Sequence, residues 1–218
     1  MSCCAILFFM IAALAQNPQG NPPASQSDIV RILMPEELAL RKVPAGNIPK
    51  EEAISRLNAA KKSAKDKRLQ KVSYLLAVLG SDYTQNRDYL LGLLNNCITK
   101  KAICDEDAGL YLVDLYRRGH RELLTPLMDA GKTGHAALAE LLGSFYSGVL
   151  IRTPAVFIAA IRARPVVEQK DLCYMAGAED GSGMPPEDLS KVRKTLRVSA
   201  DSLAHDCLAQ VEQANKKL

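Results

Sequence analysis

Few of the residues that could do chemistry stand close together in this sequence. Ser202, His205 and Cys207 lie near one another and suggest a nucleophile with its base. We expect a helix there, and neighbours along a helix point about 100° apart, so His205 and Cys207 would not face each other. Ser202 is expected to cap the N-terminus of that helix. Nucleophilic catalysis by these residues is therefore not predicted.

An enzyme site would have to be assembled from distant residues. Its candidate members are one histidine and three acids: His135, Glu140, Glu179 and Asp180. Such a set would suit a small exported hydrolase, which is the alternative to a non-enzymatic function. A closed polar pocket joining these residues would favour the enzyme, whereas an open ridge would favour a binding protein.

The segment from Gly177 to Pro186 is the most loop-like part of the expected helical region. Glu179 and Asp180 could hold a cation, but the segment lacks the alternating oxygen ligands of a calcium loop. It also lacks the Lys-Ser/Thr ending of a phosphate-binding loop. We therefore expect a connector between helices, with no metal and no cofactor.

Positive charge is concentrated between residues 61 and 71. Six cations oppose one acid, Asp66; they are Lys61, Lys62, Lys65, Lys67, Arg68 and Lys71. One interpretation is a solvated helix face whose lysine stems cover the edge of an Ala-rich core. The other is a docking surface for an anionic partner, either an acidic protein or a phosphate-bearing envelope polymer. Because no aromatic residue lies among these charges and the net charge is only +4, nucleic acid is not expected as a partner.

The N-terminus predicts export. Residues 5–15 form an uncharged apolar run, and the small side chains of Ala13 and Ala15 fit a signal peptidase, although no Lys or Arg precedes the run. The run is shorter than the about 20 apolar residues that a membrane-spanning helix needs, so stable insertion is not expected after cleavage. The alternative is a buried N-terminal core helix, but the Gln-, Asn- and Pro-rich residues that follow cannot pack beside it.

We therefore divide the chain into three parts. They are a signal peptide (residues 1–15), an extended leader rich in Pro, Gln and Asn (residues 16–48) and one α-helical domain (residues 49–218). The expected location is outside the cytosol, either periplasmic or secreted.

Signal cleavage would remove Cys3 and Cys4 and leave an even number of cysteines. Those that remain are Cys97, Cys104, Cys173 and Cys207. In an oxidising compartment this number predicts two disulfide bonds, with three possible connectivities. We favour Cys97 with Cys104, which would close a small loop between two helices, and Cys173 with Cys207. The alternative is four buried free thiols.

The domain is expected to be all-α, because the sequence has no Trp, few aromatic residues and abundant Ala and Leu. The clearest helix spans residues 105–118, with Asp105 as its cap, acids in its first turn, arginines in its last and Gly119 after its end. Pro49 is expected to begin the first helix of the domain. Further helices are expected at residues 67–79, 86–96, 121–130, 135–147, 154–163, 166–178, 187–199 and 202–216.

A shift of 33 residues aligns apolar positions of successive helices. It places Leu90, Leu91 and Leu94 over Leu123, Leu124 and Leu127, and then over Val156, Phe157 and Ala160. A period of this size is typical of stacked helix pairs. Since the agreement concerns apolar positions only, chance matching between Leu-rich helices is the alternative.

Residues 121–147 have a more specific pattern. Leu123-Leu124-Thr125-Pro126-Leu127 closes the first helix, and the second helix is Ala/Leu-rich from His135 to Gly143. This stretch resembles a HEAT-type helical repeat, a family that favours Leu-x-Pro-Leu-Leu at the end of its first helix, although the usual Val-Arg pair at the start of the second is absent. The resemblance covers about one unit. It implies a curved stack of helices that binds protein partners and carries no catalytic residues.

The expected architecture is a set of antiparallel helix pairs, stacked as a short HEAT-like α-solenoid or packed as an irregular bundle. Short connections make consecutive helices antiparallel neighbours. Helical repetition without a convergent set of acids, bases or metal ligands favours a non-enzymatic exported protein that binds a protein or an envelope component.

Overall fold

The computed structural model of the 218-residue chain describes residues 49–98, 106–131 and 136–216. Within these ranges the protein is all-α, with ten α-helices, one short 3-10 helix and no strand. The predicted fold class is therefore confirmed. The predicted signal peptide (residues 1–15) and leader (residues 16–48) lie outside the described residues and stay predictions.

The helices follow one another with short connections. They are α3 (Lys50–Lys61), α4 (Asp66–Val78), α5 (Tyr83–Ile98), α6 (Glu106–Arg117), η1 (Arg121–Leu123), α7 (Leu124–Ala130), α8 (Ala136–Arg152), α9 (Pro154–Arg162), α10 (Val166–Ala178), α11 (Pro186–Arg197) and α12 (Ser202–Lys216). The 3-10 helix η1 leads directly into α7.

Most helix boundaries lie within a few residues of the predicted ones. After α6, Gly119 has a φ of +115°, the left-handed conformation expected at a helix exit. Pro49 was expected to begin α3, but the helix begins one residue later, at Lys50. The helix expected at residues 135–147 is longer than predicted and ends at Arg152, because Val149 continues its buried face.

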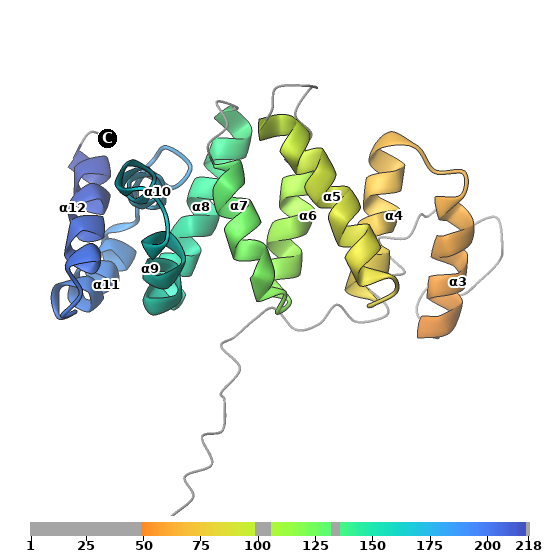
Figure 1. The fold of residues 1–218 in the computed structure, drawn as a ribbon, viewed down its shortest axis with the longest axis horizontal. Helices are drawn as coiled ribbons and strands as arrows, with labels where there is room; N and C mark the ends of the chain where they lie inside the picture. Colours follow the sequence, from red (N-terminus) through yellow and green to blue (C-terminus); the bar gives the residue numbers. More distant parts are fainter. Residues whose placement is uncertain (1–48, 99–105, 132–135, 217–218) are drawn as a thin grey trace, which may run out of the picture.

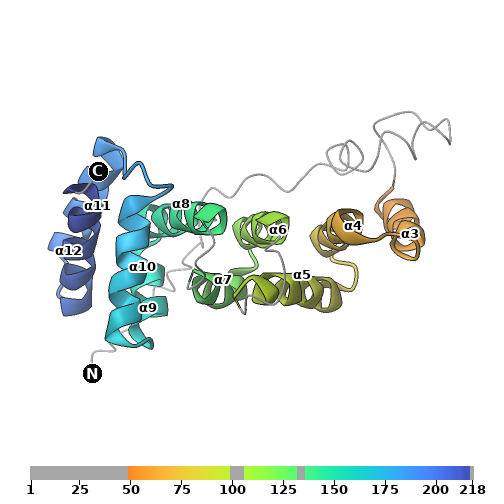
Figure 2. The same ribbon diagram turned by 90° about the horizontal axis from the view of Figure 1, so that it is seen from above.

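The helices form two layers, which are visible from above (Figure 2). α4, α6 and α8 lie side by side in one layer, while α5, α7 and α9 lie below them in the other. α3 forms one end of the molecule, and α10, α11 and α12 form the opposite end (Figure 1). Successive helices of the upper layer contact one another, and α8 continues this series by packing against α10.

One apolar core runs through the whole stack. Its fully buried side chains come from helices along its length, including Leu57 of α3, Leu76 of α4, Leu112 of α6, Phe145 of α8 and Phe157 of α9. Isolated helices shorter than about 12–15 residues are marginal in water, so most of these helices depend on their neighbours for stability. Stacking is therefore what keeps each helix folded.

The burial pattern corrects the predicted alignment at α9. Leu94 of α5 and Leu127 of α7, which a shift of 33 residues aligns, are both buried. The third aligned residue, Ala160, is only partly buried, and the buried residue is the next one, Ile161. α9 is thus offset by one residue from the predicted register.

Within the described residues, no single helix combines the length and the hydropathy of a membrane span. α8 and α9 reach those criteria only when taken together, and their axes are bent by 118° at the break between them.

The two helices α8 and α10 approach each other closely at Gly143. A Cβ atom on Gly143 would lie 1.9 Å from the carbonyl oxygen of Glu179, so no side chain fits there. Glu179 has a φ of +53°, which is unfavourable for a residue with a side chain. Its carboxylate accepts a hydrogen bond of 2.5 Å from the Ser147 hydroxyl of α8, which helps to hold that backbone conformation.

Two glycines in helix interiors should therefore respond in opposite ways to substitution by alanine. Gly143→Ala should lower the free energy of unfolding by about 2–3 kcal/mol or more, because its methyl group would collide with a backbone carbonyl. Gly92→Ala in α5 meets nothing within 4 Å and should raise it by about 0.5–1 kcal/mol. Urea unfolding followed by circular dichroism measures both. Equal effects of the two substitutions would contradict the close approach of α8 and α10.

Candidate binding groove between α9 and α11

The C-terminal helices are covalently joined. A disulfide bond links Cys173 of α10 to Cys207 of α12, with the Cα atoms 5.2 Å apart and both residues buried. This is one of the two pairings that the sequence favours. Cys104 and the side chain of Cys97 lie outside the described residues, so the other pairing stays a prediction.

A hollow of about 250 Å³ lies between α9 and α11, beside the first turn of α12. Ile158 and Leu196 are its large buried apolar residues. Its remaining lining is mostly small: Pro154, Ala155, Ala159, Thr195, Ser199 and Ala204, with Arg162 and Asp201 at one side. We call this hollow the α9–α11 groove. The groove exists because the side chains between α9 and α11 are mostly too short to fill the space between the two helices.

α9 is positioned by the break that follows α8. The Thr153 hydroxyl donates a hydrogen bond of 3.1 Å to the Val149 carbonyl, and Pro154 occupies the first position of α9. Proline suits this position because its fixed φ is helical and the missing N–H would be unpaired there in any case. α9 then buries Phe157, Ile158 and Ile161. Ala155 and Ala159 remain exposed and line the groove.

α11 is held in a similar manner. It begins at Pro186 and buries Leu189, Val192 and Leu196, so that the opposite flank of the helix faces solvent. Just past its end, Val198 is 84% exposed, the most exposed large apolar residue of the described part of the chain. The C-terminal end of α11 therefore carries an apolar side chain that the described residues do not cover.

Residues at the N-terminus of α12 also line the groove. The Asp201 carboxylate accepts a hydrogen bond of 3.1 Å from the backbone N–H of Leu203, so Asp201 caps this helix. The expectation that Ser202 is the cap is wrong: Ser202 is already helical. Asp201 also forms an ion pair with Arg162 of α9, which connects the two sides of the groove.

The two charged residues that line the groove are paired with each other, and other charged residues lie nearby in the sequence. Arg162 is paired with Asp201, and Lys191 donates a hydrogen bond of 2.7 Å to Asp188, which raises the pKa of Lys191. Two further exposed cations flank the lining residues in sequence: Arg152 before Pro154, and Lys194 next to Thr195.

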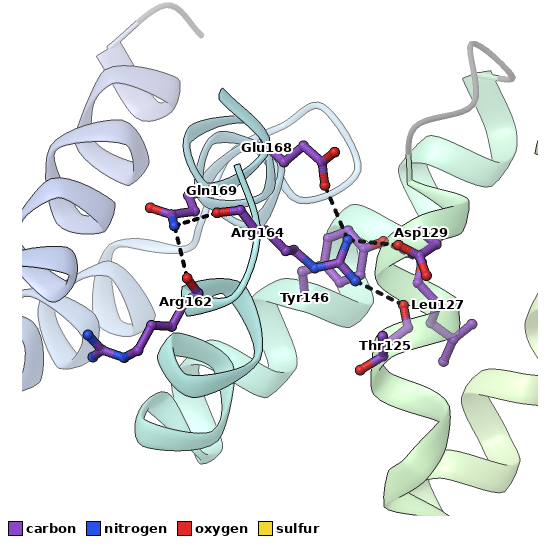
Figure 3. Close-up of polar contacts among 8 residues, drawn as sticks. All are labelled: Thr125, Leu127, Asp129, Tyr146, Arg162, Arg164, Glu168 and Gln169. Atoms are coloured by element: carbon purple, nitrogen blue, oxygen red, sulfur yellow. Dashed lines mark hydrogen bonds and ion pairs between the residues drawn. The ribbon is translucent and has the colours of Figure 1, made fainter. Parts of the chain in front are cut away.

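Arg164 anchors the end of α9 to the preceding helix pair (Figure 3). Its side chain is only 9% exposed and forms ion pairs with Asp129 of α7, at 2.8 Å, and with Glu168 of α10, at 3.4 Å. Its guanidinium also donates a hydrogen bond of 3.2 Å to the Thr125 carbonyl in α7. A nearly buried guanidinium needs such partners, because an unpaired buried charge is strongly destabilising.

Two neighbouring side chains complete this junction (Figure 3). Gln169 of α10 donates hydrogen bonds to the carbonyls of Arg162, at 3.3 Å, and Arg164, at 2.7 Å, which satisfies acceptors left over at the end of α9. The buried Tyr146 hydroxyl of α8 donates to the Leu127 carbonyl at 2.6 Å. Burial raises the pKa of Tyr146, so the hydroxyl keeps the proton that this hydrogen bond requires.

The predicted cation cluster lies at the opposite end of the molecule from the groove, on α3, α4 and their connection (Figure 1). Two of its members have internal roles: Lys61 donates a hydrogen bond of 2.6 Å to the buried Asn86, and Lys67 forms an ion pair of 3.2 Å with Asp107. Lys62, Lys65 and Arg68 are exposed, and Lys71 is half-buried. Docking of an anionic partner on this cluster stays a prediction.

The described candidate catalytic residues do not line a common pocket. His135 lies outside the described residues, and Glu140 is exposed on α8. Glu179 is bound by Ser147, while Asp180 accepts two hydrogen bonds from Ser182 within its own turn. None of the three described residues lines the α9–α11 groove or the water-sized hollow beside the disulfide. Among the described residues no three His, Cys, Asp or Glu side chains are placed to hold a metal ion.

No protein-family model, no curated protein and no solved structure matches this chain. The candidate site therefore rests on the geometry of the groove itself.

The sequence analysis did not identify the groove. Pro154 and Pro186 signal where its two helices begin, but its residues belong to segments about 40 positions apart. A run of small residues in an Ala-rich chain is not distinctive. The missing information is which face of α9 meets α11, and this depends on the anchor at Arg164.

Two arginines at the ends of α9 should differ in their importance for stability. Arg164→Met removes the charge but keeps most of the volume. It removes the ion pairs with Asp129 and Glu168 and the hydrogen bond to the Thr125 carbonyl. The substitution should lower the free energy of unfolding by about 1–3 kcal/mol. Arg162→Met breaks the ion pair with Asp201, but the Arg162 side chain is 58% exposed. This substitution should therefore lower the free energy of unfolding by less than about 1 kcal/mol. Urea midpoints measure the difference, and equal costs would contradict an anchoring role for Arg164.

Proposed function

We propose that this chain is an exported, non-enzymatic helical-repeat protein and that it binds a protein or envelope partner in the α9–α11 groove. The observation that carries the proposal is the groove itself, a hollow of about 250 Å³ whose lining is mostly apolar and small, with the paired Arg162 and Asp201 as its charged residues. Apolar hollows with a few polar groups at the edge are typical of binding sites. A large apolar side chain from a partner would gain burial there without displacing any side chain of the groove.

Export is supported by two features. The apolar run at residues 5–15 with its small residues fits a signal peptide. The disulfide bond between Cys173 and Cys207 fits an oxidising compartment, because structural disulfides are rare in the cytosol.

The layered arrangement supports a relation to helical-repeat proteins. Helices that the 33-residue shift places in register, such as α5 and α7, lie beside each other in the same layer (Figure 2). We propose that the resemblance of residues 121–147 to a HEAT-type repeat reflects this stacking. Stacks of helix pairs present extended surfaces, which suit protein binding without a deep pocket.

Blocking the groove tests the proposal. Ala159→Arg places a long charged side chain in the groove, whereas Ala59→Arg makes the same change on the exposed face of α3. Complexes are isolated from the producing cells after mild crosslinking, and their masses are determined. The wild type and Ala59→Arg should be recovered in a complex of defined mass, and Ala159→Arg should reduce its yield by about tenfold or more.

Circular dichroism of both variants checks that they are folded. Recovery of the wild type as a lone monomer in every condition would count against the proposal. A complex that persists unchanged with Ala159→Arg would show that binding takes place elsewhere.

A further inference from the structure

The chain between α9 and α10 and the chain between α11 and α12 expose apolar side chains to water. With the first two residues of α10 included, six apolar residues are exposed there: Ala163, Pro165, Val166, Val167, Val198 and Ala200. The three valines are between 62% and 84% exposed, and they are three of the five exposed large apolar residues in the described part of the chain. Single exposed apolar residues are ordinary on a protein surface, but a group of them marks a contact site.

These residues gather at one end of the C-terminal helices because α10 and α12 run parallel. The two helices lie side by side (Figure 2). Cys173 of α10 is bonded to Cys207 of α12, and one turn further along both helices Gly177 meets Val211. A Cβ atom on Gly177 would lie 2.7 Å from the Cα atom of Val211. The first turns of α10 and α12 are therefore at the same end.

Two further contacts join the connections that precede these first turns. Val166 of α10 and Leu203 of α12 line the same water-sized hollow. The ion pair between Arg162 and Asp201 links the end of α9 to the start of α12. The six exposed apolar residues thus form one surface, which we call the apolar end.

The apolar end is small for a protein interface. Stable protein interfaces use about 20–30 residues on each side, and Trp, Tyr and Arg supply most of their binding energy. The apolar end has six apolar residues, and neither residues 162–167 nor residues 197–202 include an aromatic residue. A lipid bilayer needs no matching surface, because each apolar side chain that enters it is buried independently of the others. The size and composition of the apolar end therefore favour lipid over protein.

Two arginines adjoin the apolar end. Arg162 precedes Ala163 and Arg197 precedes Val198, and their side chains are 58% and 63% exposed. Their partners are the carboxylates of Asp201 and Glu212, but exposed ion pairs contribute little to stability. A lipid phosphate can therefore compete for either guanidinium, which suits phosphate because it donates two parallel hydrogen bonds.

Charges further along the helices do not add a strong field. Two exposed lysines, Lys170 and Lys194, are matched by two exposed acids, Asp171 and Asp206. Attraction to anionic lipid is thus expected to assist apolar contact and not to replace it. Binding that combines a few apolar side chains with a few cations is reversible.

We propose that the apolar end is a membrane-contact site, at which the three valines enter the surface of a lipid bilayer and Arg162 and Arg197 contact lipid phosphates. The protein then lies on the bilayer and does not span it. This contact goes beyond the proposed function, because it does not depend on what occupies the α9–α11 groove.

Tryptophan fluorescence reports contact with lipid directly, because the sequence contains no Trp. Val198→Trp places the only Trp at the apolar end, and the matched control Leu110→Trp places it at an exposed apolar position of α6. Each protein is purified after expression of the full-length sequence and titrated with vesicles of phosphatidylethanolamine and phosphatidylglycerol. The emission of Val198→Trp should shift to shorter wavelength and be quenched by lipids with brominated acyl chains. The emission of Leu110→Trp should show neither effect.

A second pair of variants measures the contribution of the apolar side chains. Val166→Asp with Val167→Asp puts charge at the apolar end, and the helix dipole favours acids in the first turn of α10, so the fold should be kept. Leu110→Asp is the matched control. In cosedimentation with the same vesicles, the double variant should bind at least about tenfold more weakly than the wild type, and the control should bind equally well. Urea midpoints check that all proteins are folded.

Two results would overturn this inference: Val198→Trp emission that vesicles leave unchanged, and vesicle binding that Val166→Asp with Val167→Asp does not weaken. If no form binds vesicles and the double variant lowers the yield of a protein complex from the producing cells, the apolar end contacts protein and the inference also fails. None of these substitutions changes a residue that lines the α9–α11 groove. The effect of Ala159→Arg therefore tests the proposed function separately.

Discussion

The structure depends on burial that is shared between short helices. Few of these helices are long enough to be stable alone, and each hides its Leu- and Ala-rich stripe against the helices before and after it. The result is one core that continues from α3 to α12. Such a stack has no single centre, so its stability depends on contacts between neighbours. It also leaves long surfaces on which a groove can form without interrupting the core.

Polar contacts between successive helix pairs fix how the stack is aligned. Tyr74 of α4 donates a hydrogen bond of 2.6 Å to Asp114 of α6, and Tyr83 of α5 donates one of 2.5 Å to Glu122 of η1. Arg164 makes the corresponding connection from the end of α9 back to α7. Because Arg164 is nearly buried and carries a charge, it tolerates few alternative arrangements. The position of α9, and with it one wall of the groove, follows from that constraint.

The sequence predicted the helices well because their signals are local. Acids in the first turn of α6, arginines at its end and Gly119 after it depend on a few neighbouring residues. Local signals did not distinguish two adjacent candidates for the N-terminal cap of α12. Asp201 is the cap rather than Ser202, because its carboxylate accepts a hydrogen bond from the Leu203 N–H. The pairing of Cys173 with Cys207 could be favoured from spacing, and the structure places the two cysteines together.

The groove could not be predicted, because it depends on how distant segments meet. A shift of 33 residues suggested that Ala160 faces the core, whereas Ile161 does so. This offset of one residue changes which side of α9 is exposed. The bend of 118° between α8 and α9 and the ion pairs of Arg164 have no signature in the local sequence. The alanines of α9 and α12 line the groove only because of that geometry.

Amide hydrogen exchange tests the central claim most directly, because α9 is short and its order depends on the shared core. The account predicts that the amides of α9 after its first turn exchange as slowly as those of α8 and α10, since all three open only when the C-terminal helices unfold together. Exchange in α9 at the rate of an unprotected peptide, beside protected α8 and α10, would contradict it. The groove would then lack a fixed wall.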